Sequence, residues 1–227
     1  MIDYNLLKQK HVNPKAILHF EKPSSELHLD KIEGIINKSL PKDFVDFYSF
    51  CAGIDWRHKR NKNTGTVLEH SICSLQEMFG NYAKIIPATH QMGSTKEIKK
   101  LRKKNPFYYI TWNDEWYECH LDQEESLSHL NYLMNLKLLV QGQLGCCNLV
   151  IDFFDEKKDY QIYFQDHGRI LPLAIDLPKF VKIFIQIGCS YNWFLVFSDI
   201  EYQGVRFNLS KLETDFPDFD MQLLKIP

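Results

Sequence analysis

Residues 39–53 read SLPKDFVDFYSFCAG, and this stretch decides the fold that the sequence predicts. Its aromatic and cysteine side chains recur at intervals of three and four residues, at Phe44, Phe47, Tyr48 and Cys51. That spacing places them on one stripe of a helix. Pro41 suits the first helical turn, and Gly53 is predicted to end the helix because glycine readily adopts a positive φ. We therefore expect an amphipathic helix that packs its aromatic stripe on a core.

Other helices are predicted on both sides of this stretch. Apolar spacing predicts one over residues 25–37 and another over 127–139. Ser74 and Glu77 have the spacing of a capping box, which opens a short helix. Asp176 precedes Pro178 at the predicted start of a helix that continues to residue 187. In contrast, residues 56–65 are polar and basic, and they are expected to form an exposed loop.

Strands are predicted where aromatic and β-branched residues gather, over residues 107–112, 149–154 and 160–164, the last two joined as a hairpin. Helices followed by hairpin-connected strands and a closing helix indicate an α+β fold. We expect a mixed, mostly antiparallel sheet flanked by helices. The predicted organisation is an N-terminal lead-in over 1–24, one domain over 25–190, and a C-terminal extension over 191–227 that packs on the domain.

The composition of the chain limits the classes of function that it can have. The 227 residues are 44% hydrophobic and 14% aromatic, which is sufficient for a packed core, and the net charge of −2 gives no overall attraction to nucleic acid. Residues 1–10 lack a signal-peptide pattern, and polar residues interrupt the apolar window 180–197, so we expect a soluble cytoplasmic protein without a membrane span. The six cysteines lack CxxC spacing and are predicted to be reduced thiols; no metal or cofactor is expected.

The stretch 39–53 resembles the signature of the SMI1/KNR4-like, or SUKH, superfamily: a Leu-Pro step, an acidic-aromatic pair, an amphipathic helix and a glycine. Residues 142–152 (GQLGCCNLVID) resemble the family's glycine-containing approach to a central strand, and 160–167 with 176–184 resemble its last hairpin and closing helix. Ala52 and Asn148 depart from the usual Asn and Asp. The resemblance implies a sheet flanked by helices without catalytic residues. Bacterial relatives are commonly immunity proteins that neutralise toxins, many of them nucleases, whereas fungal relatives are regulatory scaffolds.

An acidic run follows the predicted strand 107–112. We predict that it binds a basic protein partner through Asp114, Glu115, Trp116, Glu118, Asp122 and Glu124. Clustered carboxylates steer a basic partner toward the surface, and a buried tryptophan anchors an interface. The alternative interpretation is a charged loop that faces water. A basic run over 96–104 precedes the same strand, but it lies in no recognised nucleic-acid motif.

For catalysis the sequence offers Cys119 beside His120 and Asp166 beside His167. Neighbouring positions of a strand point apart, and an Asp-His-Gly sequence suits a turn, so no catalytic residue is predicted. The predicted function is a non-catalytic protein-binding module, an immunity protein that occludes the active surface of a toxin. A regulatory scaffold with an endogenous partner is the main alternative, and a hydrolase that uses one of these two pairs is a further one. The oligomeric state stays open.

Overall fold

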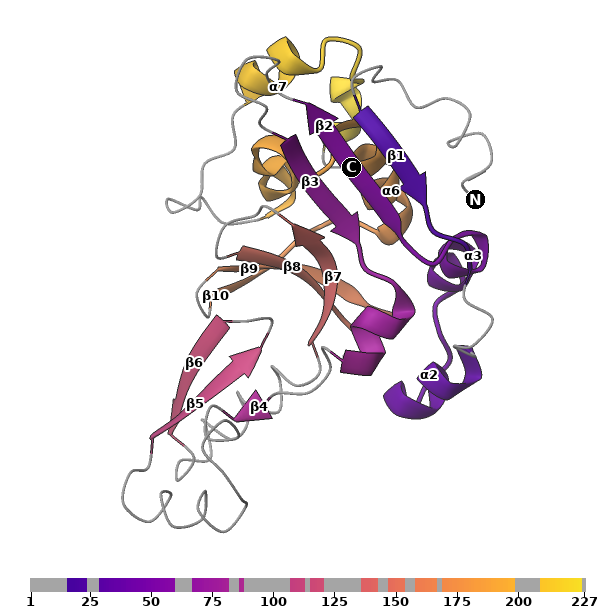
Figure 1. Ribbon diagram of the computed structural model, residues 1–227, viewed down its shortest axis with the longest axis vertical. Helices are drawn as coiled ribbons and strands as arrows, with labels where there is room; N and C mark the ends of the chain where they lie inside the picture. Colours follow the sequence, from indigo (N-terminus) through magenta and orange to yellow (C-terminus); the bar gives the residue numbers. More distant parts are fainter. Residues whose placement is uncertain are drawn as a thin grey trace.

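The computed structural model describes residues 16–23, 29–59, 67–81, 86–87, 107–112, 115–120, 136–142, 147–153, 158–166, 169–198 and 209–225. Its main element is a seven-stranded sheet in which every described pairing is antiparallel (Figure 1). In spatial order the strands are β1 (Ala16–Phe20), β2 (Ile54–Lys59), β3 (Val67–Ile72), β7 (Leu136–Gly142), β8 (Cys147–Asp152), β9 (Gln161–Asp166) and β10 (Arg169–Pro172). This order follows the sequence, with one interruption between β3 and β7. The predicted α+β class, with a mostly antiparallel sheet flanked by helices, is confirmed.

The segment of chain between β3 and β7 contains a second sheet. Its three strands, in the order β4-β5-β6, are β4 (Ile86–Pro87), β5 (Phe107–Trp112) and β6 (Glu115–His120). β5 confirms the strand that the sequence predicts over the same residues. Because β3 and β7 are antiparallel neighbours, a short hairpin would be enough to join them. The seven-stranded sheet therefore does not require this insertion.

Helices accompany the main sheet at both ends of the chain. They are α2 (Leu29–Ile36), α3 (Lys42–Phe50), the π-helix η1 (Glu77–Asn81), α6 (Leu177–Ile187), η3 (Ser190–Phe197), α7 (Leu209–Asp215) and η4 (Met221–Leu224). Figure 1 shows α6 behind β1 and β2. None of the described helices is both long enough and apolar enough to span a membrane.

α3 is the helix of the stretch 39–53. Pro41 is its N-cap, and its aromatic stripe is buried, with Phe44 and Phe47 at 0% exposure, as the spacing predicts. The prediction for Gly53 is wrong, because the helix already ends at Cys51, which has an extended backbone. A Cβ atom on Gly53 would lie 2.7 Å from the carbonyl oxygen of Ile72. Glycine is needed there because β2 and β3 approach closely at their ends.

Several local predictions are confirmed. The capping box forms: the Ser74 amide donates to Glu77 Oε2 over 2.6 Å, and the Glu77 amide donates to Ser74 Oγ over 3.3 Å. Asp176 caps α6 by accepting a hydrogen bond from the Lys179 amide over 2.7 Å. The predicted hairpin is the antiparallel pair β8 and β9.

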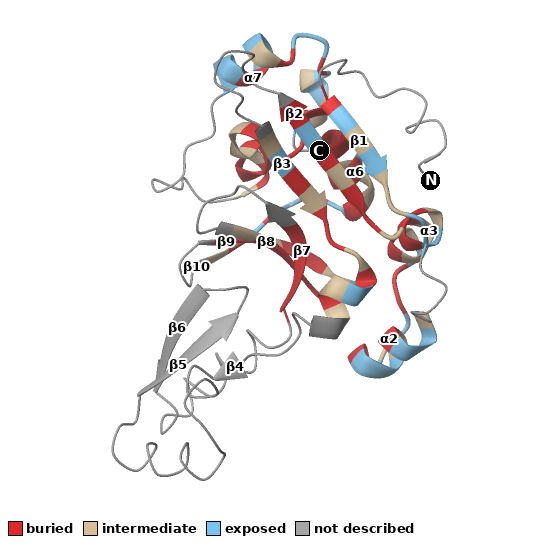
Figure 2. Cartoon of the chain, viewed as in Figure 1, coloured by how far each residue is buried: buried red, intermediate tan, exposed pale blue. Residues whose placement is uncertain are grey.

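Residues 56–59 were expected in an exposed loop, and this prediction is wrong because they belong to β2. Their side chains alternate: Trp56 and His58 are buried at 0% and 4%, and Arg57 is exposed (Figure 2). The polar composition concealed the strand, since a buried histidine resembles a surface residue in sequence. Residues 60–65 lie outside the described part of the chain.

The helix predicted over 127–139 is also wrong at its C-terminal end. Residues 136–139 open β7, and residues 127–135 lie outside the described residues. All five of Leu136, Lys137, Leu138, Leu139 and Val140 are buried, and a bulge interrupts the pairing with β8 between Leu138 and Val140. A strand that is buried on both faces lacks alternation, so its apolar run resembles a helix.

Both ends of the described chain take part in the fold. Residues 16–20, which were assigned to the lead-in, form the edge strand β1 paired with β2. After residue 190 the buried side chains join the same core as the sheet, and they are Trp193, Phe194, Leu195, Phe197, Leu212, Phe216, Phe219 and Leu224. The core therefore extends beyond the predicted domain limits of 25 and 190 in both directions.

Candidate protein-binding surface

Three of the predicted binding residues lie on β6. Among the described strands, β6 is one of the two edge strands of the small sheet. Glu115, Trp116 and Glu118 pair with Trp112, Thr111 and Tyr109 of β5. Positions 116 and 118 of a strand share one face, and position 115 lies on the other. Glu115 and Glu118 therefore occupy positions on opposite faces of β6. The other predicted binding residues, Asp114, Asp122 and Glu124, lie outside the described residues, as does the basic run 96–104.

The hairpin of β5 and β6 brings two kinds of residue together. β5 reads FYYITW and is rich in aromatic residues, whereas β6 reads EWYECH and carries two glutamates. The interpretation of residues 115–120 as a charged loop is replaced by a strand. Opposed aromatic and charged positions across a hairpin form a pattern that fits protein recognition, in which aromatic anchors and charged groups cooperate.

Of the residues that the sequence offers for catalysis, three are described, and they lie on β6 and at the end of β9. Cys119 and His120 occupy consecutive positions of β6, which face opposite sides of a strand. Asp166 ends β9, and His167 lies outside the described residues. Cys51, Cys73 and Cys189 are buried thiols. Among the described residues, no group of three or more His, Cys, Asp or Glu side chains could hold a metal ion.

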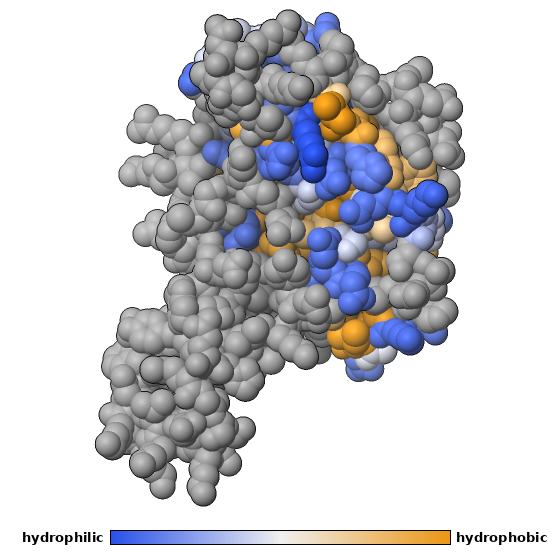
Figure 3. Space-filling view, in the orientation of Figure 1, coloured by the Kyte–Doolittle hydropathy of each residue, from blue (hydrophilic) through white to orange (hydrophobic). Residues whose placement is uncertain are grey.

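The outer face of β1, β2 and β3 is a second surface, which the sequence did not indicate. Figure 3 shows hydrophilic residues grouped over the middle of this face beside hydrophobic ones. Arg57 Nε lies 3.4 Å from Glu69 Oε1, and Ser71 Oγ donates to Asp55 Oδ1 over 2.7 Å. These groups satisfy one another across neighbouring strands.

A cleft of about 330 Å³ lies between the end of β1, α3 and the start of η1. Tyr48 and Leu75 are its buried residues, and Glu21 contributes a carboxylate. Burial raises the pKa of Glu21, and the carboxylates of Asp55 and Glu77 raise it further. The described lining contains no imidazole or thiol, and its polar groups include the Glu21 carboxylate and the hydroxyls of Ser49 and Ser74, so it could hold a small polar group.

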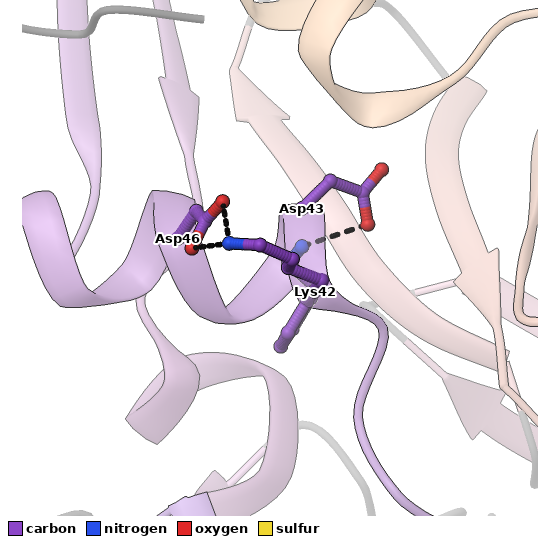
Figure 4. Close-up of polar contacts among 4 residues, drawn as sticks. Lys42, Asp43 and Asp46 are labelled. Carbon is purple, nitrogen blue, oxygen red and sulfur yellow. Dashed lines mark hydrogen bonds and ion pairs between the residues drawn. The ribbon is translucent and has the colours of Figure 1, made fainter. Parts of the chain in front are cut away.

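Asp43, the acidic residue of the stretch 39–53, has a structural role. Tyr160 Oη donates to Asp43 Oδ2 over 2.5 Å and accepts from the Leu177 amide over 2.7 Å, so it joins α3 to the start of α6. Asp43 Oδ1 also accepts from the Phe44 amide over 2.8 Å (Figure 4). Burial, together with the hydrogen bond to Asp43, raises the pKa of Tyr160 well above its usual range. The tyrosine is therefore a fixed donor rather than an acid-base group.

Replacing Tyr160 with Phe should lower the free energy of unfolding by about 1–3 kcal/mol, because the Leu177 amide and the Asp43 carboxylate lose a partner in a partly buried site. Urea unfolding measures this loss. The control is Lys42→Ala, which removes the exposed ion pair of Lys42 Nζ with Asp46, at 2.8 Å (Figure 4). That change should cost no more than about 0.5 kcal/mol. Equal costs for the two variants would contradict the assigned role of Tyr160.

The other titratable groups with a marked pKa shift are dispersed through the described core. Burial lowers the pKa of His70 to about 4 and also lowers the pKa of Lys137, whereas burial raises the pKa of Tyr48 and Cys189. They lie on different elements of the described chain, and the residues His70 and Cys189 are joined by a hydrogen bond from the Cys189 amide to His70 Nδ1. The chain matches no family model, and its comparison with curated proteins and with solved structures gives no match.

Proposed function

We propose that this chain is a non-catalytic protein-binding module that neutralises a toxin by occluding its basic active surface. The observation that carries the proposal is the position of β6. It holds Glu115, Trp116 and Glu118, and among the described strands it is an edge strand of a separate sheet inserted between adjacent strands of the main sheet. Binding residues are frequently located in an insertion that the main domain does not need for its own folding.

The chemistry of β6 suits a basic partner. An edge strand has backbone N–H and C=O groups along its edge that can pair with an extended segment of another protein. Its glutamates would accelerate association with a cationic surface and complement the charges that become buried there. Enzymes that act on nucleic acid need such cationic surfaces to attract phosphate. The resemblance of residues 39–53 to the SMI1/KNR4-like superfamily supports the same function independently of β6.

Replacing Glu115 and Glu118 with Lys should slow association with the basic partner about tenfold or more at low salt, because the variant repels the surface that the native chain attracts. The difference should shrink as the salt concentration rises, since ions screen exposed charges. Stopped-flow or surface-plasmon measurements of the association rate over a salt series test this expectation.

The matched control reverses two exposed acidic residues elsewhere. Glu213 and Asp218 lie near the C-terminus, and their replacement with Lys changes the net charge by the same amount. This control should retain an association rate close to the native one. If both pairs of reversals slow association equally, only the net charge matters, and β6 is not the binding site.

A further inference from the structure

His70 of β3 contacts the turn that follows α6. It is 3% exposed, and its Nδ1 atom accepts a hydrogen bond from the Cys189 amide over 3.4 Å. The preceding residue, Gly188, has φ 58°, and a Cβ atom there would lie 2.5 Å from the Trp56 ring and 2.8 Å from His70 Nδ1. The backbone of this turn therefore lies directly against β2 and β3.

The turn is linked to the C-terminal part of the core. The carbonyl oxygen of Gly188 accepts a hydrogen bond from Trp193 Nε1 over 2.6 Å, which ties the turn to η3. Tyr191 Oη of η3 donates to Asp215 Oδ2 of α7. The next residue, Phe216, packs with its ring centroid 6.3 Å from that of Trp56. The turn, η3 and α7 are thus connected to one another, and the turn and Phe216 both lie against Trp56 of β2.

Protonation of His70 would break this contact for two reasons. An imidazolium has N–H groups at both nitrogens, so Nδ1 could no longer accept a hydrogen bond from the Cys189 amide. The positive charge would also be buried, and the Cys189 thiol and the His58 imidazole supply no negative charge to balance it. The nearby carboxylates of β2 and β3, Asp55 and Glu69, are already bonded to Ser71 and Arg57. Of the two carboxylates of α7, Glu213 is exposed and Asp215 is already bonded to Tyr191.

We propose that His70 is a pH-dependent latch: its neutral imidazole holds the turn at Gly188 and Cys189 on the sheet, and its protonation releases the turn together with η3 and α7. Burial lowers the pKa of His70 from 6.5 to about 4. Above pH 6.5 the imidazole of His70 is neutral in both the latched and the released form, so pH does not change the ratio of the two forms. Below it the released form binds a proton first, and the latched form is progressively disfavoured until about pH 4.

The exposure of Cys189 reports the release. The thiol is buried at 2%, so it reacts with a pyridyl disulfide reagent only when the turn opens. Between pH 8 and pH 5 the released population of the full chain should rise about 30-fold. The labelling rate of each cysteine is measured by peptide mass spectrometry and divided by its rate in the unfolded chain at the same pH. Cys51 and Cys73, both 1% exposed, report global unfolding.

The expected result is a rise of about 30-fold for Cys189, with a normalised labelling rate at pH 5 that exceeds the rates of Cys51 and Cys73. The rates of these two cysteines also rise, because global unfolding frees His70 as well. His70→Gln should abolish the rise, because an amide oxygen can replace Nδ1 as the acceptor but does not bind a proton in this range. His58→Gln should retain it. Equal normalised labelling rates at the three cysteines of the native chain at pH 5 would overturn the latch even if the His70 variant failed to fold. A rise that persists in His70→Gln, or disappears in His58→Gln, would also overturn it.

Discussion

Replacing Phe44 with Ala should lower the free energy of unfolding by about 3–5 kcal/mol. Phe44 is fully buried on α3, and its ring centroid lies 4.5 Å from that of Tyr48 and 4.8 Å from that of Phe153. The smaller side chain would leave a cavity among aromatic rings that cannot close around it without moving α3 toward the end of β8. The loss should appear in urea unfolding as a lower midpoint with an unchanged slope.

Ser49→Ala on the same helix is the control, since Ser49 is exposed and its replacement should change stability by no more than about 0.5 kcal/mol. A cost below about 1 kcal/mol for Phe44→Ala would contradict the packing of α3 on the core, because a fully buried aromatic ring cannot be removed so cheaply.

Gly188→Ala should be about as damaging, with an expected cost of about 2–5 kcal/mol that combines backbone strain and overpacking. Gly188 has φ 58° and ψ −141°, a conformation that side chains with a Cβ rarely adopt. The added methyl group would also lie 2.5 Å from Cε3 of Trp56, inside van der Waals contact. The substitution would therefore force either the turn or β2 to move.

Gly34 in α2 provides the opposite case, since nothing lies within 4 Å of a Cβ atom there. Gly34→Ala should stabilise the protein by about 0.5–1 kcal/mol, because alanine is the better helix former. Thermal or urea unfolding of both variants distinguishes the two sites. If Gly188→Ala were as stable as Gly34→Ala, the close contact of the turn with Trp56 would be wrong.

Local chemistry could be predicted from the sequence wherever one or two residues determine it. The Ser74–Glu77 box and the Asp176 cap are formed by side chains acting within four residues of their own backbone. The α3 stripe and the β8–β9 hairpin follow from regular spacing. Each of these features depends on contacts that are local in sequence.

The remaining fold depends on distant contacts that no local pattern specifies. β1 has one buried residue in five, so only its pairing with β2 defines it as a strand. β2 buries His58 beside Trp56, where a composition of Arg, His and Lys suggests a surface. β7 has no alternation because both of its faces are covered.

The candidate site likewise combines features that are local in sequence with features that depend on distant contacts. The acidic and aromatic residues around 112–118 could be recognised from composition, but their division between two faces of β6 required the pairing with β5. The contact of His70 with Cys189 joins residues that are far apart in sequence, and nothing near either residue indicates it.

The measurement that tests the proposed function most directly is affinity capture from the native lysate, with the tagged full chain and its Glu115→Lys, Glu118→Lys variant compared side by side by quantitative mass spectrometry. We expect the native chain to retain one basic polypeptide in stoichiometric amount and the variant to lose most of it. Capture of several endogenous regulatory proteins, equally by both chains, would contradict an inhibitor that acts through β6 and would favour a regulatory scaffold. Failure of the native chain to retain any stoichiometric protein would contradict a dedicated protein-binding module.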